Sequence, residues 1–425
     1  MFIEASSPAN FSEERAMDTI FARCAGLDVH KESVPSCVRR MEADGIKQEV
    51  RSFGTMTGDL LALADWLSAH GVTHVAMEST GVYWKPVYNI LEAAGFQVLL
   101  VNARHLKKVP GRKTDIRDCQ WIAQLLQAGL LRGSFVPPRA LRELRDLTRH
   151  RAQLVAEATR VANRLQKTLE DANVKLSSVA SDILGVSGRR MLESLASGVD
   201  DPDVVAALAR GRLRAKLPQL RRALEGTLSP HHRFMLRLLL NHLDELNALI
   251  EELAARIEEQ MSPFEEEISR LDQIPGVNRQ TAENILAEIG TDMSHFPSDD
   301  HLCSWAGICP GNQQSAGKRK SGKIPKGDRW LRRTLTQAAW AASRTKASYF
   351  SAQYRRLAKH RGKKRAVLAV AHALLRTIYH MLKNHTPYTD LGSDYFDRLH
   401  PDRLTHYLVK RLQSLGHTVI LQPAP

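Results

Sequence analysis

Two long stretches of the chain repeat apolar residues at alternating spacings of three and four. One stretch places them at Leu144, Leu147, Leu154, Ala158, Val161 and Leu165, with Arg151 on a seam position. The clearer one slips near Met261 and runs through Leu239, Leu243, Leu246, Ile250, Leu253, Ile257, Phe264, Ile268 and Leu271. Such heptads predict a helical, coiled-coil region over residues 139–271. The seam could close a hairpin within one chain, join two copies, or pack two helices on their own domain.

Residues 22–133 show a mixed α/β pattern instead. The segments "ARCAGLDVH", "SVPSCVRR" and "KQEVRSFG" predict three successive short strands. A helix over 57–70, the strand "THVAME", a helix over 82–94, the strand "FQVLLVN" and a further helix should follow. Three strands and then alternating helix and strand is the order of an RNase H-like (RuvC-like) domain, although other α/β folds can begin in the same way.

The remaining segments are predicted to be helical or loosely structured. Residues 1–21 and 386–425 are expected to form tails, and residues 176–235 a basic helical stretch. Residues 272–385 form a mainly helical C-terminal domain. Its segment "LDQIPGVNRQTAENILAEIG" predicts a helix-hairpin-helix element, which can offer backbone amides to a DNA phosphate.

The composition favours a polyanionic partner and an intracellular location. The 60 Lys and Arg exceed the 46 Asp and Glu, for a net charge of +14, and nucleic acid is the commonest partner of such a chain. Five cysteines without a C-x-x-C pair predict neither a disulfide framework nor a zinc site. No apolar run reaches membrane-spanning length, and the N-terminus lacks a signal-peptide pattern. We therefore expect a cytoplasmic protein.

Four carboxylates are candidates for a metal site. Asp28 and Glu78 end predicted strands, and Asp115 and Asp118 lie on one face of a predicted helix. In an RNase H-like fold these positions converge, and two carboxylates about 4 Å apart repel by roughly 4 kcal/mol at an effective dielectric near 20. Two Mg²⁺ or Mn²⁺ ions would relieve that repulsion and could bridge a phosphate. Taken singly, the acids also fit helix-capping, turn or surface roles.

A second candidate centre is the loop "GNQQSAGKRKSGKIPKGDRWLRR". It holds eight Lys or Arg between residues 318 and 333 and a single acid, Asp328. Ser315 opens it as a candidate nucleophile, with Ser321 as a competitor, but no nearby histidine or carboxylate offers to be its base. The predicted phosphate-binding residues are Lys107, Lys108, Arg112, Lys113, Lys318, Arg319, Lys320, Lys323, Lys326 and Arg332. Farther on, the helices predicted over 346–385 continue the basic face.

Together the motifs "GLDVHK", "MESTG", "KTDIRD", "IPGV" and "QSAGKRKSGKIPKGDRWLRR" resemble the DEDD transposases of the insertion-sequence one-ten type, relatives of the Piv DNA invertase. The resemblance spans residues 22–385. It implies an N-terminal RuvC-like domain, a coiled-coil connection and a C-terminal transposase domain. It also implies that Asp28, Glu78, Asp115 and Asp118 bind the metal and that Ser315 becomes joined to a DNA phosphate.

The resemblance further implies a bacterial, nucleoid-associated recombinase that cuts and rejoins DNA with strand exchange. Its partners would be donor and target DNA, a noncoding bridge RNA and further copies of itself, as a dimer or tetramer. The base for Ser315 would then come from the metal site, contributed by a different copy of the chain. Two other hypotheses stay open: a RuvC-like Holliday-junction nuclease that uses water as the nucleophile, and a catalytically inactive nucleic-acid-binding relative. The intact set of four acids argues against the last.

Overall fold

The computed structural model describes residues 20–79, 81–102, 118–311, 313–315, 317–322, 324–399 and 401–422, with the side chains of 313–315 and 319–321 left out. The chain divides into two compact units, Met1–Val136 and Pro137–Pro425. Within the described residues, no helix combines the length and the apolar character needed to cross a membrane.

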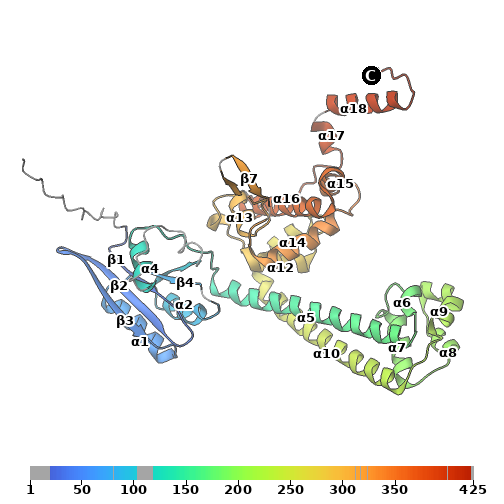
Figure 1. The fold of residues 1–425 in the computed structure, drawn as a ribbon, viewed down its shortest axis with the longest axis horizontal. Coiled ribbons are helices and arrows are strands. Elements are labelled where there is room, and N and C mark those ends of the chain that lie inside the picture. The colour runs from blue at the N-terminus through green and yellow to red at the C-terminus, as the bar shows by residue number, and fades with distance from the viewer. Residues whose placement is uncertain are drawn as a thin grey trace, which may run out of the picture. The chain divides into compact units, whose positions relative to one another are not determined.

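The first unit is built on a five-stranded sheet in the order β3-β2-β1-β4-β5 (Figure 1). The strands are β1 (Arg23–Leu27), β2 (Val34–Glu42), β3 (Gly45–Phe53), β4 (His74–Glu78) and β5 (Gln97–Val101). The first three pair antiparallel, whereas β4 lies parallel to β1 and β5 parallel to β4. All five predicted strands are confirmed, and the sheet is mixed.

Alternating side chains of β1 face two different helical layers, because successive residues of a strand point to opposite faces. Ala25 and Leu27 pack with α1 (Thr57–Ala69) and α2 (Trp84–Ala93). Cys24 packs on the other face with α4 (Asp118–Gln127). The helices predicted over 57–70 and 82–94 are therefore confirmed, and the sheet lies between two layers of helix.

Two long helices dominate the first part of the second unit. The helices α5 (Arg139–Asp171) and α10 (Pro230–Met261) lie side by side within the chain (Figure 1). Their buried seam residues include Leu154, Val161, Leu165, Leu239, Leu243 and Leu246. The seam is thus covered inside one chain, and helices α7 (Val186–Ser197) and α9 (Leu217–Leu224) contribute to the same core, which fits both the hairpin and the packing of two helices on their own domain.

Short helices connect the two long ones. They are α6 (Leu176–Val179), α7 (Val186–Ser197), α8 (Pro202–Ala206), the 3-10 helix η1 (Gly211–Lys216) and α9 (Leu217–Leu224). The heptad slip near Met261 marks the end of α10. Pro263 lies in a 3-10 turn (Ser262–Phe264) that separates α10 from α11 (Glu265–Asp272), so the repeat does not continue as one helix.

The C-terminal part of this unit contains the two helices and the tight turn of the predicted helix-hairpin-helix element. The helices α11 and α12 (Arg279–Ile289) flank a turn in which Gly276 has φ +85°. A Cβ at Gly276 would lie 2.4 Å from the carbonyl oxygen of Ala338 in α14 (Arg329–Ala342). That face of the turn is therefore filled by α14, so a phosphate cannot approach there.

The rest of the unit surrounds the buried helix α16 (Lys363–Asn384). Around it lie the 3-10 helix η3 (Met293–His295), α13 (Asp299–Trp305), α14 and α15 (Tyr349–Arg361). The expectation of a loosely structured C-terminus is wrong for the described residues, because α17 (Tyr395–Leu399) and α18 (Pro401–Ser414) are helical. Phe396 of α17 stacks on Tyr349 of α15 with ring centroids 5.2 Å apart.

The prediction of a flexible N-terminal tail falls outside the described residues except for its last two. Ile20 and Phe21 donate backbone hydrogen bonds to the carbonyl of Gln127.

Candidate functional site

Asp28 and Glu78 lie beside each other at the carboxyl edge of the sheet. Leu27 pairs with Met77 in the parallel register of β1 and β4, and the next residue on each strand is Asp28 and Glu78. Neighbouring strands lie about 4.8 Å apart. Because the carboxyl ends of parallel strands are where α/β sheets bind ligands, this pair occupies a favourable place for a site.

The backbone around Asp28 is fixed by hydrogen bonds. Its N–H donates to the carbonyl of Pro35 at 2.9 Å, and the N–H of His30 donates to Ser33 at 2.9 Å. His30 Nε2 also donates to Asp28 Oδ2 at 3.0 Å, and the Asp28 side chain is 17% exposed. His30 therefore orients the carboxylate of Asp28 while most of its own ring faces solvent.

Asp118 begins α4 at the same end of the sheet. A Cβ at Gly26 would lie 2.3 Å from both the carbonyl oxygen of Cys119 and the amide nitrogen of Ala123, so α4 crosses β1 in backbone contact. Cys24, two residues earlier on the strand, donates its thiol to the carbonyl of Ala123 at 3.6 Å. The helix therefore runs antiparallel to β1, and its first residue lies toward Asp28.

The structure thus places three of the four predicted carboxylates at one end of the sheet. Asp115 lies outside the described residues, together with Lys107, Lys108, Arg112 and Lys113. Across the ranges that the structure describes, no three His, Cys, Asp or Glu side chains are arranged to hold a metal ion. The chemistry of the carboxylates of Asp28, Glu78 and Asp118 nevertheless fits Mg²⁺ or Mn²⁺, because carboxylate oxygens are the ligands that such hard cations prefer.

The predicted serine loop is a two-stranded β-ribbon. β6 (Gln313–Ser315) pairs antiparallel with β7 (Lys318–Ser321), and Ser315 is opposite Lys318 at the tip. Gly317 has φ +74°, the conformation that a two-residue hairpin turn requires. The backbone therefore presents Ser315 next to a tight turn rather than in an extended loop. We call residues 313–321 the serine ribbon.

The predicted basic residues of this region differ in placement. Lys318 and Lys326 are exposed, and Arg332 is half-buried in the first turn of α14. Lys323 and the side chains of Arg319 and Lys320 lie outside the description.

The base of the serine ribbon is closed by backbone contact. A Cβ at Gly327 would lie 2.2 Å from the amide nitrogen of Gly307, and one at Gly307 would lie 2.6 Å from that of Gly327. The N–H of Asp328 also donates to the carbonyl of Trp305 at 3.3 Å. The segments that enter and leave the ribbon are therefore held together, which fixes the position from which it projects.

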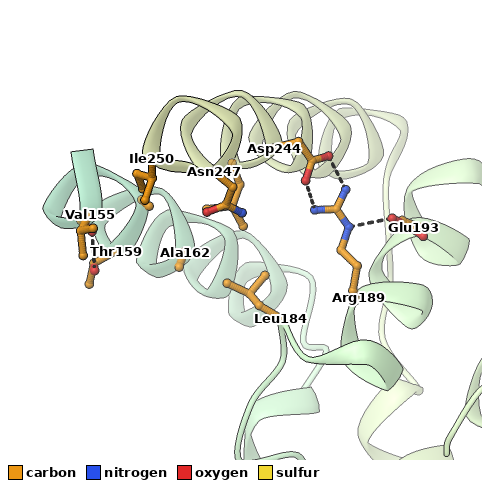
Figure 2. Close-up of a pocket in the computed structure, with 11 residues that line it drawn as sticks. Val155, Thr159, Ala162, Leu184, Arg189, Glu193, Asp244, Asn247 and Ile250 are labelled. Carbon is orange, nitrogen blue, oxygen red and sulfur yellow. Dashed lines mark hydrogen bonds and ion pairs between the residues drawn. The ribbon is translucent and has the colours of Figure 1, made fainter. Parts of the chain in front are cut away.

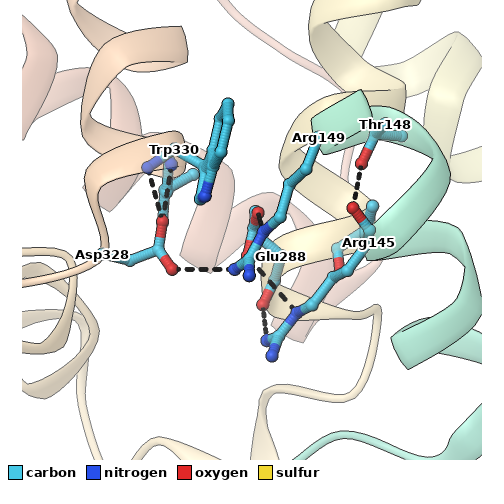
Figure 3. A network of polar contacts seen from close by, with 8 residues as sticks. Arg145, Thr148, Arg149, Glu288, Asp328 and Trp330 are labelled. Atoms are coloured by element: carbon cyan, nitrogen blue, oxygen red, sulfur yellow. Dashed lines mark hydrogen bonds and ion pairs between the residues drawn. The ribbon is translucent and has the colours of Figure 1, made fainter. Parts of the chain in front are cut away.

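Charged side chains join this base to α5 and α12 (Figure 3). Arg149 makes two hydrogen bonds of 2.7 Å to the carboxylate of Glu288 and one of 3.1 Å to Asp328 Oδ2. Arg145 donates to the carbonyls of Ala287 (3.0 Å) and Glu288. The side chain of Glu288 is only 3% exposed, and burial raises the pKa of its carboxyl although Arg149 acts against that shift.

Sequence reasoning missed this network, although one signal pointed to it. Arg151, on the apolar seam of α5, is buried and donates to Glu283 (3.0 Å) and Asn284 (3.1 Å) of α12. A cation on an apolar seam indicates a buried partner, because an unpaired buried charge is costly. The acids that pair with Arg145, Arg149 and Arg151 lie more than 130 residues away along the chain. The sequence alone therefore did not identify them.

A separate groove of about 860 Å³ lies between α5, α7 and α10 (Figure 2). Its wall includes Val155, Leu184 and Ile250. Its principal charged group, Arg189, is held by Asp244 at 2.7 and 2.6 Å and by Glu193 at 2.7 Å. Because that guanidinium is already paired, the groove offers a ligand little beyond apolar contact.

Comparisons with known proteins give a consistent result. A model of DEDD transposases of the IS110 type, described as "Transposase", matches residues 25–174, and one described as "Transposase IS116/IS110/IS902 family" matches residues 268–355. Together the two models cover more than half of the chain. The first range contains the four candidate carboxylates and the second contains Ser315.

Individual relatives agree with the two family models. The chain is 26% identical over 317 residues to an insertion element IS110 uncharacterized 43.6 kDa protein of Streptomyces coelicolor, covering 66% of this chain and 73% of that protein. It is 32% identical over 123 residues to pilin gene-inverting proteins of Moraxella bovis and Moraxella lacunata, covering 28% of this chain and 38% of each of those proteins.

Proposed function

Because this chain belongs to the family of IS110-type transposases, we propose that it is the recombinase of an insertion sequence, which cuts and rejoins DNA through a covalent link to Ser315. The observation that carries the proposal is the parallel register that sets Asp28 beside Glu78, with α4 delivering Asp118 to the same end of the sheet. The strand order β3-β2-β1-β4-β5 is compatible with the RNase H-like fold that the resemblance implies.

In the proposed reaction the Ser315 hydroxyl attacks a DNA phosphorus atom. A bond from Ser315 Oγ to phosphorus forms as the bond from phosphorus to a deoxyribose oxygen breaks, and that oxygen leaves as a hydroxyl after taking up a proton. Attack by the hydroxyl of another strand reverses the exchange and rejoins the DNA. No cofactor is consumed, because one phosphodiester replaces another at each step.

The acids Asp28, Glu78, Asp115 and Asp118 would hold two Mg²⁺ or Mn²⁺ ions. Bound there, the metal would neutralise charge that develops on the phosphate and its leaving oxygen. The serine ribbon needs such help, because the acid nearest to it in sequence, Asp328, is engaged with Arg149 and the start of α14. A carboxylate of the first unit, from the same or another copy of the chain, is the proposed acceptor of the serine proton.

A basic surface supports the nucleic-acid partner. Residues 329–389 contain fourteen Lys or Arg and no Asp or Glu. Around Gly362, which joins α15 to α16, the cations are exposed: Arg355, Arg356, Lys359, Arg361, Lys363, Lys364 and Arg365. Such a surface binds phosphates without reading bases. We therefore propose that base pairing with a noncoding bridge RNA selects the donor and target DNA, while the protein, as a homo-oligomer, contacts the backbone.

The proposal is tested with DNA that carries the ends of the element, in the presence of its flanking noncoding RNA and Mg²⁺. Ser315→Ala and Glu78→Gln should each abolish strand cleavage and rejoining, whereas the matched control Ser321→Ala should retain both. Cleavage that survives in Ser315→Ala but not in Glu78→Gln would instead identify a junction nuclease that uses water. Binding without cleavage by the wild-type chain on any junction DNA would favour an inactive relative.

A further inference from the structure

Asp328 uses its two carboxylate oxygens for different tasks. Oδ1 accepts the N–H groups of Trp330 and Leu331, at 2.8 Å each, and so caps the start of α14. Oδ2 accepts the guanidinium of Arg149 in α5, at 3.1 Å. One residue at the foot of the serine ribbon therefore fixes the beginning of a helix and at the same time joins the ribbon to a second helix.

The arrangement is difficult to explain by stability alone. Glu288 and Arg145 are 3% and 12% exposed, and Arg149 is 29% exposed. Moving such charges out of water costs about as much as their mutual attraction returns, and apolar side chains of similar volume often serve stability equally well. What the bidentate Arg149–Glu288 pair supplies is a fixed guanidinium, which then binds Asp328 through one hydrogen bond. The network is thus better suited to setting a position than to stabilising the fold.

The position that it sets is that of the serine ribbon. The Gly307 and Gly327 backbones touch at the ribbon's base, and Asp328 follows directly on Gly327. Arg149 lies in the first three turns of α5, the helix through which the chain enters its second unit after Val136. The ribbon is therefore attached to the element that follows the unit carrying Asp28 and Glu78.

We propose that Arg149 and Asp328 are positioning residues for the attack of Ser315. Neither side chain contacts the DNA in the proposed reaction. They fix the position and orientation of the serine ribbon relative to α5 and α14, so that the Ser315 hydroxyl approaches the phosphorus atom in a reactive geometry. The inference rests on the proposed function, because it gives the ribbon a reacting serine to position. A misplacement of about 1 Å can lower a rate by about a hundredfold, so a loose ribbon should bind DNA but react slowly.

Conservative substitutions separate positioning from folding. Asp328→Asn keeps an oxygen for the N-cap, since Asn caps as well as Asp, but turns an amide group toward Arg149. Asp328→Ser also caps the helix but is too short to reach Arg149. Arg149→Lys supplies a single point charge in place of the planar fork. Glu157→Gln on α5 is the matched control, because the Glu157 side chain is 44% exposed and its carboxylate lies 3.9 Å from the Arg160 guanidinium, in a pair outside the network.

The measurement is the single-turnover rate at which the full chain becomes covalently joined to DNA, with thermal unfolding and DNA affinity measured on the same samples. We expect Asp328→Asn and Asp328→Ser to slow adduct formation more than about tenfold. The rate of Arg149→Lys should lie between that of the wild type and those of the two Asp328 variants. DNA affinity should stay within about twofold and Glu157→Gln should match the wild type.

Three results would overturn the proposal. Adduct formation at the wild-type rate in both Asp328 variants would show that the link is dispensable. A loss that only follows lost DNA affinity or a lost folded fraction would show a structural role. A wild-type chain that forms no adduct while recombination proceeds would refute the serine mechanism itself, and the positioning role with it.

Discussion

Gly26→Ala should displace α4 from the sheet and separate Asp118 from the other acids. The added Cβ would lie 2.3 Å from two backbone atoms of α4, the carbonyl oxygen of Cys119 and the amide nitrogen of Ala123. Restoring ordinary contact requires the helix to move by about 1 Å, since neither atom belongs to a side chain that could rotate away. Overpacking of this kind costs about 1–3 kcal/mol.

The expected result is a thermal transition of the first unit lowered by roughly 5–10 °C. A shift of about 1 Å at Asp118 should also reduce strand cleavage by about a hundredfold. Circular dichroism on heating measures the first effect, and cleavage of element-end DNA at a temperature where both proteins are folded measures the second.

Gly58→Ala is the matched control. Gly58 is an exposed residue of α1, and a Cβ there meets nothing within 4 Å. This variant should keep full activity and gain up to about 0.5 kcal/mol, because alanine is the better helix former. If Gly26→Ala behaved like Gly58→Ala in both assays, the close crossing of α4 over β1 would be wrong. If it lost stability but cleaved normally, the placement of Asp118 would not matter for the reaction.

Three further predictions concern the second unit. Arg151→Met should cost about 3 kcal/mol, the lower end for a broken buried ion pair, because Glu283 loses its buried partner but retains Arg279 at 3.3 Å. Adding Glu283→Met should recover part of that loss in urea unfolding, and a single variant within about 1 kcal/mol of the wild type would contradict the pairing. Lys318→Ala should lower the slope of log affinity against log salt by about one without changing sequence preference, measured by titration with labelled DNA, and an unchanged slope would remove Lys318 from the interface. Burial raises the pKa of the Cys303 thiol to about 12. At pH 8 iodoacetamide should therefore modify Cys303 in the unfolded chain but not in the native one, as measured by mass spectrometry. Equal rates in both states would show that Cys303 is accessible.

Local patterns made the first unit predictable. Its strands β1, β4 and β5 are short, mostly apolar runs, and its helices α1 and α2 carry apolar residues at helical spacing, so each of these elements follows from side chains within about ten residues. The order of the elements then placed Asp28 and Glu78 at strand ends. The local sequence pattern did not predict the close contact at Gly26, because that contact is made with a helix more than ninety residues later in the chain.

The second unit shows where sequence reasoning stops. The serine ribbon contains Gly, Ser, Gln and Lys, which are poor strand formers, and its pairing depends on the turn at Gly317. The Arg149–Asp328 contact joins residues 179 apart in sequence, beyond the reach of any local periodicity. At the C-terminus, α18 carries Leu404, Leu408 and Leu412 at helical spacing, a local signal that the sequence interpretation missed, although none of its residues is buried.

The central claim is that the chain becomes joined to DNA through Ser315. The direct measurement is to trap the wild-type chain on element-end DNA with Mg²⁺, digest the protein and the DNA, and sequence the nucleotide-bearing peptide by mass spectrometry. We expect the nucleotide to be attached to Ser315 and no adduct to form when the metal is chelated. Attachment to Ser321 or to any other residue, or recombination that proceeds with no adduct at all, would contradict it.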